Sequence, residues 1–221
     1  MTAVIKMENV SKSFQKNIIL DNLNLEVEQG ELVAIIGKSG CGKSTLLNIL
    51  VLLDKASKGK VKIYDQQSIR PFSRKAEKLL HDKIGYLFQN YALIENETIE
   101  YNLNIVFDYR IKKEERKQKI DEALDQVGLK VMEKKKVYQC SGGEQQRIAL
   151  ARLSIKSCQL ILADEPTGNL DYENKEKVFN LLKAFNQSGK TVIIVTHDIE
   201  LAKKCHKIYQ MNQGKLSNYA N

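Results

Sequence analysis

The stretch Gly37-Lys38-Ser39-Gly40-Cys41-Gly42-Lys43-Ser44 decides the fold of this chain of 221 residues. It follows an apolar run, Glu31 to Ile36, and leads into Lys43 to Leu53, where the apolar residues have helical spacing. Glycines let backbone N–H groups point at phosphate oxygens, and a loop between a buried strand and a helix is where such a site is found. The sequence therefore predicts an α/β domain with a phosphate-binding loop.

The residues at the end of this loop have expected roles. Lys43 would reach the β and γ phosphates of a nucleotide, Ser44 would offer its hydroxyl to Mg²⁺, and Thr45 would make the next contact. The positive end of the following helix dipole would add to the attraction. The alternative is a glycine turn with an exposed lysine, and the flanking strand and helix favour the phosphate site.

Strands and helices alternate along the rest of the chain. Further strands are predicted at Ala3 to Val10, Leu23 to Val27, Val61 to Tyr64, Ile84 to Phe88, Leu160 to Ala163 and Thr191 to Val195, and further helices within Thr98 to Gly128, after Gly143, at Tyr172 to Phe185 and from Asp198. This alternation argues for a mostly parallel sheet. The chain is expected to be one domain, 1–221, in which approximately 1–89 and 155–221 form the core and approximately 90–154 an inserted helical subdomain.

Two carboxylates follow the apolar strand Leu160 to Ala163. Asp164 and Glu165 would stand at the carboxyl edge of the sheet, where ligands of α/β folds bind. Adjacent carboxylates at the end of a buried strand are unfavourable unless they meet a cation. We therefore expect Asp164 to be a partner of Mg²⁺ and Glu165 to be the base that polarises an attacking water. The alternative is a strand end with solvated acids.

Gln89 and His197 each follow a predicted strand, so both should project to the same edge as Asp164. An amide at position 89 could sense water and Mg²⁺, and an imidazole at position 197 could bond a γ-phosphate. Either residue could instead be an ordinary polar strand end.

Three further side chains, each with a ring, have two possible roles or an expected place at the surface. Phe14 could stack on an adenine, or it could belong to the core. His81 and His206 lie in lysine-rich stretches that read as helical, and both are expected to be surface residues.

A second glycine-rich stretch, Cys140-Ser141-Gly142-Gly143-Glu144-Gln145-Gln146-Arg147, opens a predicted helix with a serine hydroxyl. This is also phosphate-binding chemistry, although the chain already has one phosphate loop. The economical explanation is that the second stretch holds a nucleotide carried by a second copy of the protein.

Composition narrows the functional class. No apolar run approaches the roughly 20 residues needed to cross a bilayer, and Met1 to Val10 lacks the apolar stretch of a signal peptide. The four cysteines include no CxxC pair, which argues against a zinc site or a disulfide framework. The net charge of +8 comes from lysine clusters without interleaved aromatics, so a solvated surface is favoured over nucleic-acid binding. We expect a cytosolic protein that reaches a membrane only through a partner.

In this order, the motifs resemble the nucleotide-binding subunit of ABC transporters over essentially the whole chain. The resemblance implies the family's named elements: an A-loop aromatic at Phe14, Walker A at Gly37 to Ser44, the Q-loop at Gln89, the signature at Ser141 to Gln145, Walker B at Leu160 to Glu165, the D-loop at Asp171 and the H-loop at His197. Three departures stand out. Phe14 stands where tyrosine is commoner, which keeps the stacking and loses only a hydroxyl. Cys140 replaces the usual leucine, and Val51 replaces a glycine that often follows the Walker A helix.

The resemblance also implies a fold and a function. The fold would be that of a P-loop NTPase with an N-terminal antiparallel β portion. The cofactors would be ATP and Mg²⁺, and the partners a second copy of the chain and a multi-span membrane permease, which would hold the protein on the inner face of the membrane. The residues of the signature and Walker B motifs resemble those of the branch for macrolide export, lipoprotein release and bacteriocin export.

Two other functions remain open at this level. The chain could drive a membrane partner that acts in signalling and does not transport a substrate. Alternatively, it could be an ABC ATPase that acts on nucleic acid. The nucleic-acid members usually add coiled coils, zinc modules or a second cassette, for which this chain has no room.

Overall fold

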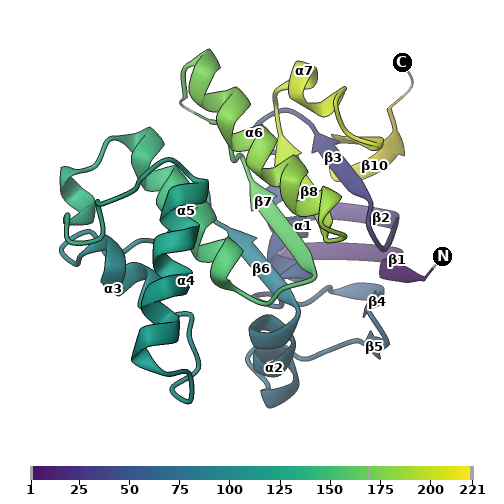
Figure 1. The fold of residues 1–221 in the computed structure, drawn as a ribbon. Helices are drawn as coiled ribbons and strands as arrows, with labels where there is room; N and C mark the ends of the chain where they lie inside the picture. Colours follow the sequence, from purple (N-terminus) through teal and green to yellow (C-terminus); the bar gives the residue numbers. More distant parts are fainter. Residues whose placement is uncertain (1, 169, 220–221) are drawn as a thin grey trace. The chain divides into compact units, whose positions relative to one another are not determined.

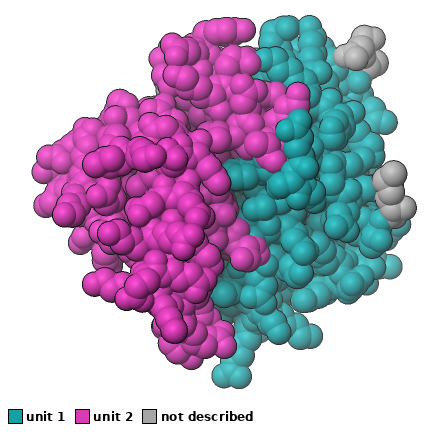
Figure 2. All heavy atoms as spheres, in the orientation of Figure 1, with its two compact units in different colours: residues 1–86, 158–165, 185–221 teal, residues 87–157, 166–184 magenta. Residues whose placement is uncertain are grey.

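The computed structural model describes residues 2–168 and 170–219 (Figure 1). By their contacts they form two compact units, which Figure 2 colours separately. The first unit comprises residues 1–86, 158–165 and 185–221, and the second comprises residues 87–157 and 166–184.

The first unit is built on a mostly parallel sheet. Its strands, in the order in which they pair, are β10 (Lys215–Asn218), β9 (Lys207–Asn212), β3 (Leu32–Ile36), β8 (Thr191–Thr196), β7 (Leu160–Asp164) and β6 (Ile84–Leu87). Pairing is parallel between β3 and both β8 and β9 and between β7 and β8, whereas β9 and β10 are antiparallel. Every residue of β3, β7 and β8 is buried, as expected of parallel strands covered on both faces. The predicted fold class is confirmed.

The N-terminal part of the chain forms a separate antiparallel sheet. Its strands pair in the order β2 (Asn17–Glu28), β1 (Ala3–Phe14), β4 (Lys58–Ile63) and β5 (Gln66–Gln67). Buried and exposed residues largely alternate along β2, because one face of the sheet packs on the core. Residues such as Ile5, Leu25, Leu47 and Ile193 belong to one buried cluster, so both sheets share a single core.

The phosphate loop continues into helix α1 (Lys43–Leu50), as predicted, but the helix ends earlier than expected. Val51 caps it at φ −88°, and the left-handed conformation falls on Leu52 at φ 58°. A β-branched residue accepts the negative φ at position 51 without strain, and its side chain is 1% exposed. The backbone at position 51 therefore does not require glycine.

The C-terminal part departs from the prediction. The helix expected from Asp198 is the four-residue α7 (Ile199–Ala202), and the chain then forms β9 and β10. His206 is therefore not on a helix; the Leu32 N–H donates to its Nδ1 at 3.1 Å, just before β9 pairs with β3. Pairing with a distant strand overrides the local lysine-rich pattern. His81 does lie on a helix, α2 (Arg74–Asp82), and is exposed.

The second unit is mainly helical. It contains α3 (Ile99–Asn104), α4 (Lys113–Gln126), the short 3-10 helix η1 (Val137–Gln139), α5 (Gly142–Ile155) and most of α6 (Tyr172–Gln187), and α5 contacts both α3 and α4. The highly charged α4 buries only Ile120, Ala123 and Leu124, whose spacing places them on one side of the helix. Within residues 2–168 and 170–219, no helix combines the length and apolarity needed to cross a bilayer.

Candidate functional site: two phosphate-binding motifs

The loop before α1 is shaped by glycine at two positions. Gly42 has φ 111° and stands at the N-cap of α1 without a side-chain cap, so the N–H groups of the first turn are open to a ligand. A Cβ on Gly42 would lie 2.9 Å from Leu20 Cδ2, and one on Gly37 would lie 2.5 Å from the Met211 carbonyl oxygen. Both positions therefore require glycine, and the main chain is left bare where phosphates would bind.

Lys43 lies inside this loop and is only 7% exposed. Its Nζ donates to the Gly37 carbonyl at 2.7 Å and to the Lys38 carbonyl at 3.1 Å, and it lies 3.7 Å from Glu165 Oε1. The alternative of an exposed lysine in a glycine turn is therefore wrong. The loop holds a cation at its centre, which suits the binding of an anion.

Asp164 has the environment of a metal ligand. Its carboxylate is 7% exposed, and burial raises its pKa above the ordinary range. Oδ2 accepts a hydrogen bond from the Tyr86 hydroxyl at 3.5 Å, and Ser44 also bonds the carboxylate. Oδ1 is buried and accepts no hydrogen bond from the described residues. A buried carboxylate oxygen with unused acceptor capacity, next to a serine hydroxyl, fits the oxygen coordination that Mg²⁺ prefers.

Glu165 joins the phosphate loop to the end of β8. It has the left-handed φ of 46°, and its side chain is 14% exposed. Oε2 lies 2.8 Å from His197 Nδ1 and accepts the His197 backbone N–H at 3.3 Å. Backbone strain of this kind persists only where the surroundings hold it and is concentrated at functional sites. Lys43, Glu165 and His197 thus meet at the carboxyl ends of neighbouring parallel strands, as the sequence predicted.

Phe14 lies at the end of β1, and its side chain is 51% exposed. The alternative that it belongs to the core is therefore wrong. Lys12 Nζ lies 4.6 Å from the centre of the Phe14 ring and forms an ion pair with Asp54. Lys12 is only 7% exposed, and it was not identified from the sequence. Its position two residues after Val10 was the available signal.

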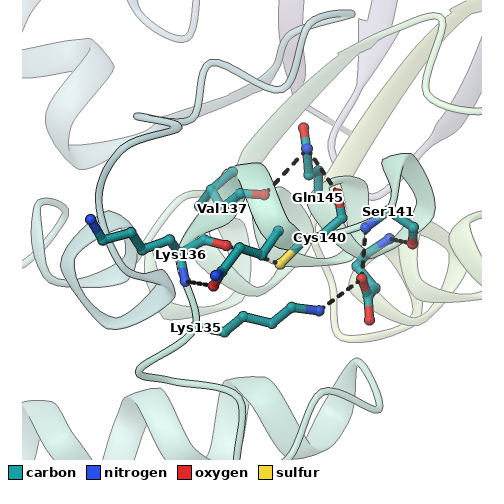
Figure 3. Close-up of polar contacts among 8 residues, drawn as sticks. Lys135, Lys136, Val137, Cys140, Ser141 and Gln145 are labelled. Carbon is teal, nitrogen blue, oxygen red and sulfur yellow. Dashed lines mark hydrogen bonds and ion pairs between the residues drawn. The ribbon is translucent and has the colours of Figure 1, made fainter.

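The second glycine-rich stretch starts a helix, as predicted (Figure 3). Ser141 is the N-cap of α5: its Oγ accepts the Glu144 N–H at 3.2 Å, and Glu144 Oε2 accepts the Ser141 N–H at 2.7 Å. The bond from Ser141 and the nearby Lys135 ammonium, 3.4 Å away, hold the pKa of Glu144 below its usual range. The N–H groups of Gly142 and Gly143, in the first turn of the helix, stay available to an anion, whereas the Ser141 hydroxyl also bonds the Glu144 carboxylate.

The residues before α5 pack behind this N-terminus. Gln145 Nε2 donates to the carbonyls of Val137 at 3.3 Å and Cys140 at 3.1 Å. Cys140 is 7% exposed, and its Sγ lies 3.7 Å from the Lys136 carbonyl oxygen. Burial raises the pKa of this thiol. Cys140 thus fills the apolar position expected of it.

The two glycines of this stretch have different surroundings. A Cβ on Gly143 would lie 3.4 Å from Asn174 Cγ, whereas one on Gly142 meets no described atom within 4 Å. Asn174 also links Asp171 to the helix, because it donates to both Asp171 oxygens at 2.8 Å and its Oδ1 accepts from Arg147 at 3.0 Å. The main-chain bond is the N-cap bond of α6. Asn174 was not identified from the sequence. Its position three residues after Asp171, an aspartate that precedes a helix, was the signal for this contact.

The structure assigns the predicted residues to two groups. Gly37 to Thr45, Asp164, Glu165 and His197 belong to the first unit, together with Phe14, whereas Gln89, Ser141 to Glu144 and Asp171 belong to the second. Gln89 follows the end of β6 by two residues. Ser44 is exposed and Thr45 is partly buried.

Known proteins are similar to this chain over nearly all of its length. The chain is 37% identical over 217 residues to the lipoprotein-releasing system ATP-binding protein LolD of Aquifex aeolicus, covering 98% of this chain and 97% of LolD. It is 38% identical over 219 residues to the macrolide export ATP-binding/permease protein MacB of Acinetobacter baylyi, covering 97% of this chain and 33% of MacB. The chain therefore spans about a third of the length of MacB.

A solved structure is similar over nearly the whole fold. It is the dimeric post-hydrolysis state of the ATP-binding cassette MJ0796 of Methanocaldococcus jannaschii bound to ADP and Pi, with a TM-score of 0.88, 36% identity and coverage of 98% of this chain and 99% of that one. The family model for ABC transporters matches residues 20–168. The chain therefore belongs to the ABC transporter family and is an ATPase of that family.

Proposed function

We propose that two copies of this chain enclose two ATP molecules, each held between Gly37 to Thr45 of one copy and Ser141 to Gly143 of the other. Phe14 would stack on the adenine, and Asp171 and Glu144 would lie beside the shared site. The dimeric state of the MJ0796 relative supports this arrangement. Each copy then supplies half of each active site.

The observation that carries the proposal is the open space at Gly142. Glycine is less favourable than alanine by about 1 kcal/mol in a helix interior, and by less than that at the first position, where Gly142 lies. No described atom lies within 4 Å of a Cβ at this position, and no positive φ is needed there. Packing within the chain thus gives no reason for the glycine. The close approach of a ligand held by a second molecule does give one.

The Gly142→Ala variant is therefore expected to change stability and function in opposite directions. Its thermal unfolding midpoint should stay equal or rise by about 2–4 °C, since alanine is the better helix former. ATP-dependent dimer formation should weaken, because a methyl group would occupy the space of a phosphate oxygen. Thermal unfolding and light scattering with Mg-ATP measure the two effects.

A control for Gly142→Ala should not strain the backbone. Another glycine-to-alanine change, Gly189→Ala, does not meet this condition, because Gly189 has φ +93° and a side chain there is strained. Ser154→Ala, further along α5, is the matched control: it changes the same helix far from its N-terminus and should leave dimer formation intact. A Gly142→Ala protein that dimerises like the parent would contradict the proposed approach of the nucleotide.

Within the first unit, hydrolysis would depend on positioning and charge. Lys43 would hold the β and γ phosphates, and Ser44 and Asp164 would hold Mg²⁺, which neutralises charge on the phosphates. Glu165 would take a proton from the attacking water, and His197, 2.8 Å from that carboxylate, would orient it and bond the γ-phosphate. Asp164 ends β7 and His197 follows β8, and both strands are buried along their whole length, which favours a preorganised arrangement of the groups.

We propose further that this ATPase drives export of a peptide-like or amphiphilic substrate through a separate permease, and that the permease holds it on the inner face of the membrane. The names of the relatives for macrolide export and lipoprotein release support this class of substrate. A multi-span membrane protein should therefore co-purify with the chain in detergent. Salt-sensitive binding of DNA or RNA without such a partner would contradict it.

A further inference from the structure

Arg152 joins helix α5 to the segment that follows Gln89. Its Nη1 donates to the Ala92 carbonyl at 2.6 Å, and its Nη2 donates to the Tyr91 carbonyl at 2.7 Å. Both distances are short, as expected when the donor is charged. Arg152 lies ten residues after Gly142 on α5, which is about 15 Å along the helix axis. One rigid element thus carries the signature residues at its start and this guanidinium near its end.

The backbone of the two residues that Arg152 hydrogen-bonds is strained. Tyr91 has φ 62° and Ala92 has φ 46°, so two successive residues with a Cβ are in the left-handed conformation. Such residues are held by their surroundings rather than by their own preference. Local bonds from Tyr91 N–H to the Phe88 carbonyl and from Ala92 N–H to the Asn90 carbonyl close the turn.

The next residues are fixed to a different helix. The Asn102 side chain of α3 is fully buried; it accepts the Ile94 N–H at 2.7 Å and donates to the Ile94 carbonyl at 3.1 Å. The segment after Gln89 is thus held at two points, by Asn102 on α3 and by Arg152 on α5. The second point lies on α5 itself, and the Glu95 and Glu97 carbonyls also accept the Tyr138 and Val137 N–H groups shortly before that helix.

The chemistry of Arg152 suits a fixed link. Burial lowers its pKa, but a guanidinium keeps its charge throughout the physiological range. The planar fork of arginine presents two parallel N–H donors, matching the two successive carbonyls, whereas the single ammonium of lysine does not. The link therefore depends on the shape of the side chain as well as on its charge.

We infer that Arg152 is a positioning residue, which ties the Tyr91–Ala92 turn to α5 so that displacement of the Gln89 segment moves Ser141 to Gly143 with it. The inference rests on the proposed shared ATP site for the role of Ser141 to Gly143. The tie itself lies wholly within the second unit and involves no residue that would touch ATP.

The test compares Arg152→Lys with the parent in ATP titration, steady-state hydrolysis and hydrogen exchange. The variant should keep the affinity for ATP and the KM within about twofold, because the phosphate loop is elsewhere in the fold. Its kcat should fall by about tenfold, the loss expected for one charge-assisted hydrogen bond. Amides of residues 91–94 should exchange faster, while those of residues 37–44 should not change.

Arg110→Lys is the matched control, since Arg110 is an exposed arginine paired with Asp108 in the same unit, and it should leave all these values unchanged. A second variant, Arg152→Lys with Ala92→Gly, separates a tie from a purely structural role. Glycine takes a positive φ without strain, so this change removes the need for Arg152 to hold a strained conformation at position 92. If Arg152 acts as a tie, kcat stays low in this double variant.

Two results would overturn the inference: recovery of kcat in the double variant, or an unchanged kcat in Arg152→Lys. A fall in kcat together with a large loss in unfolding midpoint and faster exchange throughout the chain would also overturn it, because the effect would then be general destabilisation. Failure of the shared ATP site would give a different result: a Glu165→Gln variant, blocked in hydrolysis, would bind Mg-ATP without dimerising, while the dependence of kcat on Arg152 would be measured as before.

Discussion

Replacing Lys43 by alanine is expected to lower the affinity for ATP by about tenfold to a hundredfold. A hydrogen bond to a charged group contributes about 1.5–3 kcal/mol, and each 1.4 kcal/mol is a factor of ten in affinity. A second effect acts in the same direction: without the ammonium 3.7 Å from Glu165 Oε1, the carboxylate of Glu165 would repel the γ-phosphate. Calorimetric titration with ATP measures the loss directly.

Two further variants separate this effect from charge and folding. Lys60→Ala removes one positive charge from an exposed position of β4 and should keep the parental affinity. Lys43→Met keeps most of the buried side-chain volume, so it should unfold near the parental temperature while still binding ATP weakly. Parental ATP affinity in a folded Lys43→Met protein would contradict the assignment of the phosphate loop.

The same variant can test whether active sites are shared between copies. Lys43→Ala damages one half of a site and Ser141→Arg the other half, so each protein alone should be inactive. In an equal mixture, roughly a quarter of the parental activity should return, because half of the dimers are mixed and each has one intact site of two. No recovery on mixing, from two proteins that fold normally, would contradict a site built from two copies.

The sequence was sufficient for the parts of the fold with strong local signals. The buried strands β3, β7 and β8 were predicted because each is a short apolar run that ends at a glycine or a polar residue. The meeting of Glu165 with His197 followed from strand ends in a parallel sheet. The strands depend on residues close together in the chain, and the contact between Glu165 and His197, 32 positions apart, follows from a general rule for parallel sheets.

What the sequence did not yield depends on distant partners. Strands β9 and β10 have weak local patterns, and β9 is set by pairing with β3, well over a hundred residues earlier. Arg152 looks like any helical arginine until its bonds to Tyr91 and Ala92, about sixty positions away, are known. Local propensity carries no information about such contacts.

Replacing Glu165 by glutamine is expected to lower kcat by about a hundredfold to ten-thousandfold, the usual contribution of a general base. The amide cannot accept a proton from water, but its oxygen can still accept the His197 backbone N–H that the carboxylate accepts at 3.3 Å. The variant should therefore keep the local geometry and bind ATP. Phosphate release measures turnover, and calorimetric titration measures affinity.

Because hydrolysis would be blocked after the nucleotide has bound, the Glu165→Gln protein should also accumulate as a dimer with Mg-ATP. Scattering should detect a doubling of mass that ADP does not produce. Glu115→Gln is the control, since Glu115 is paired with Lys119 on the surface of α4 and its loss should alter neither turnover nor mass. Unchanged phosphate release would assign the base elsewhere, whereas a monomer saturated with ATP would leave Glu165 as the base and exclude the shared site.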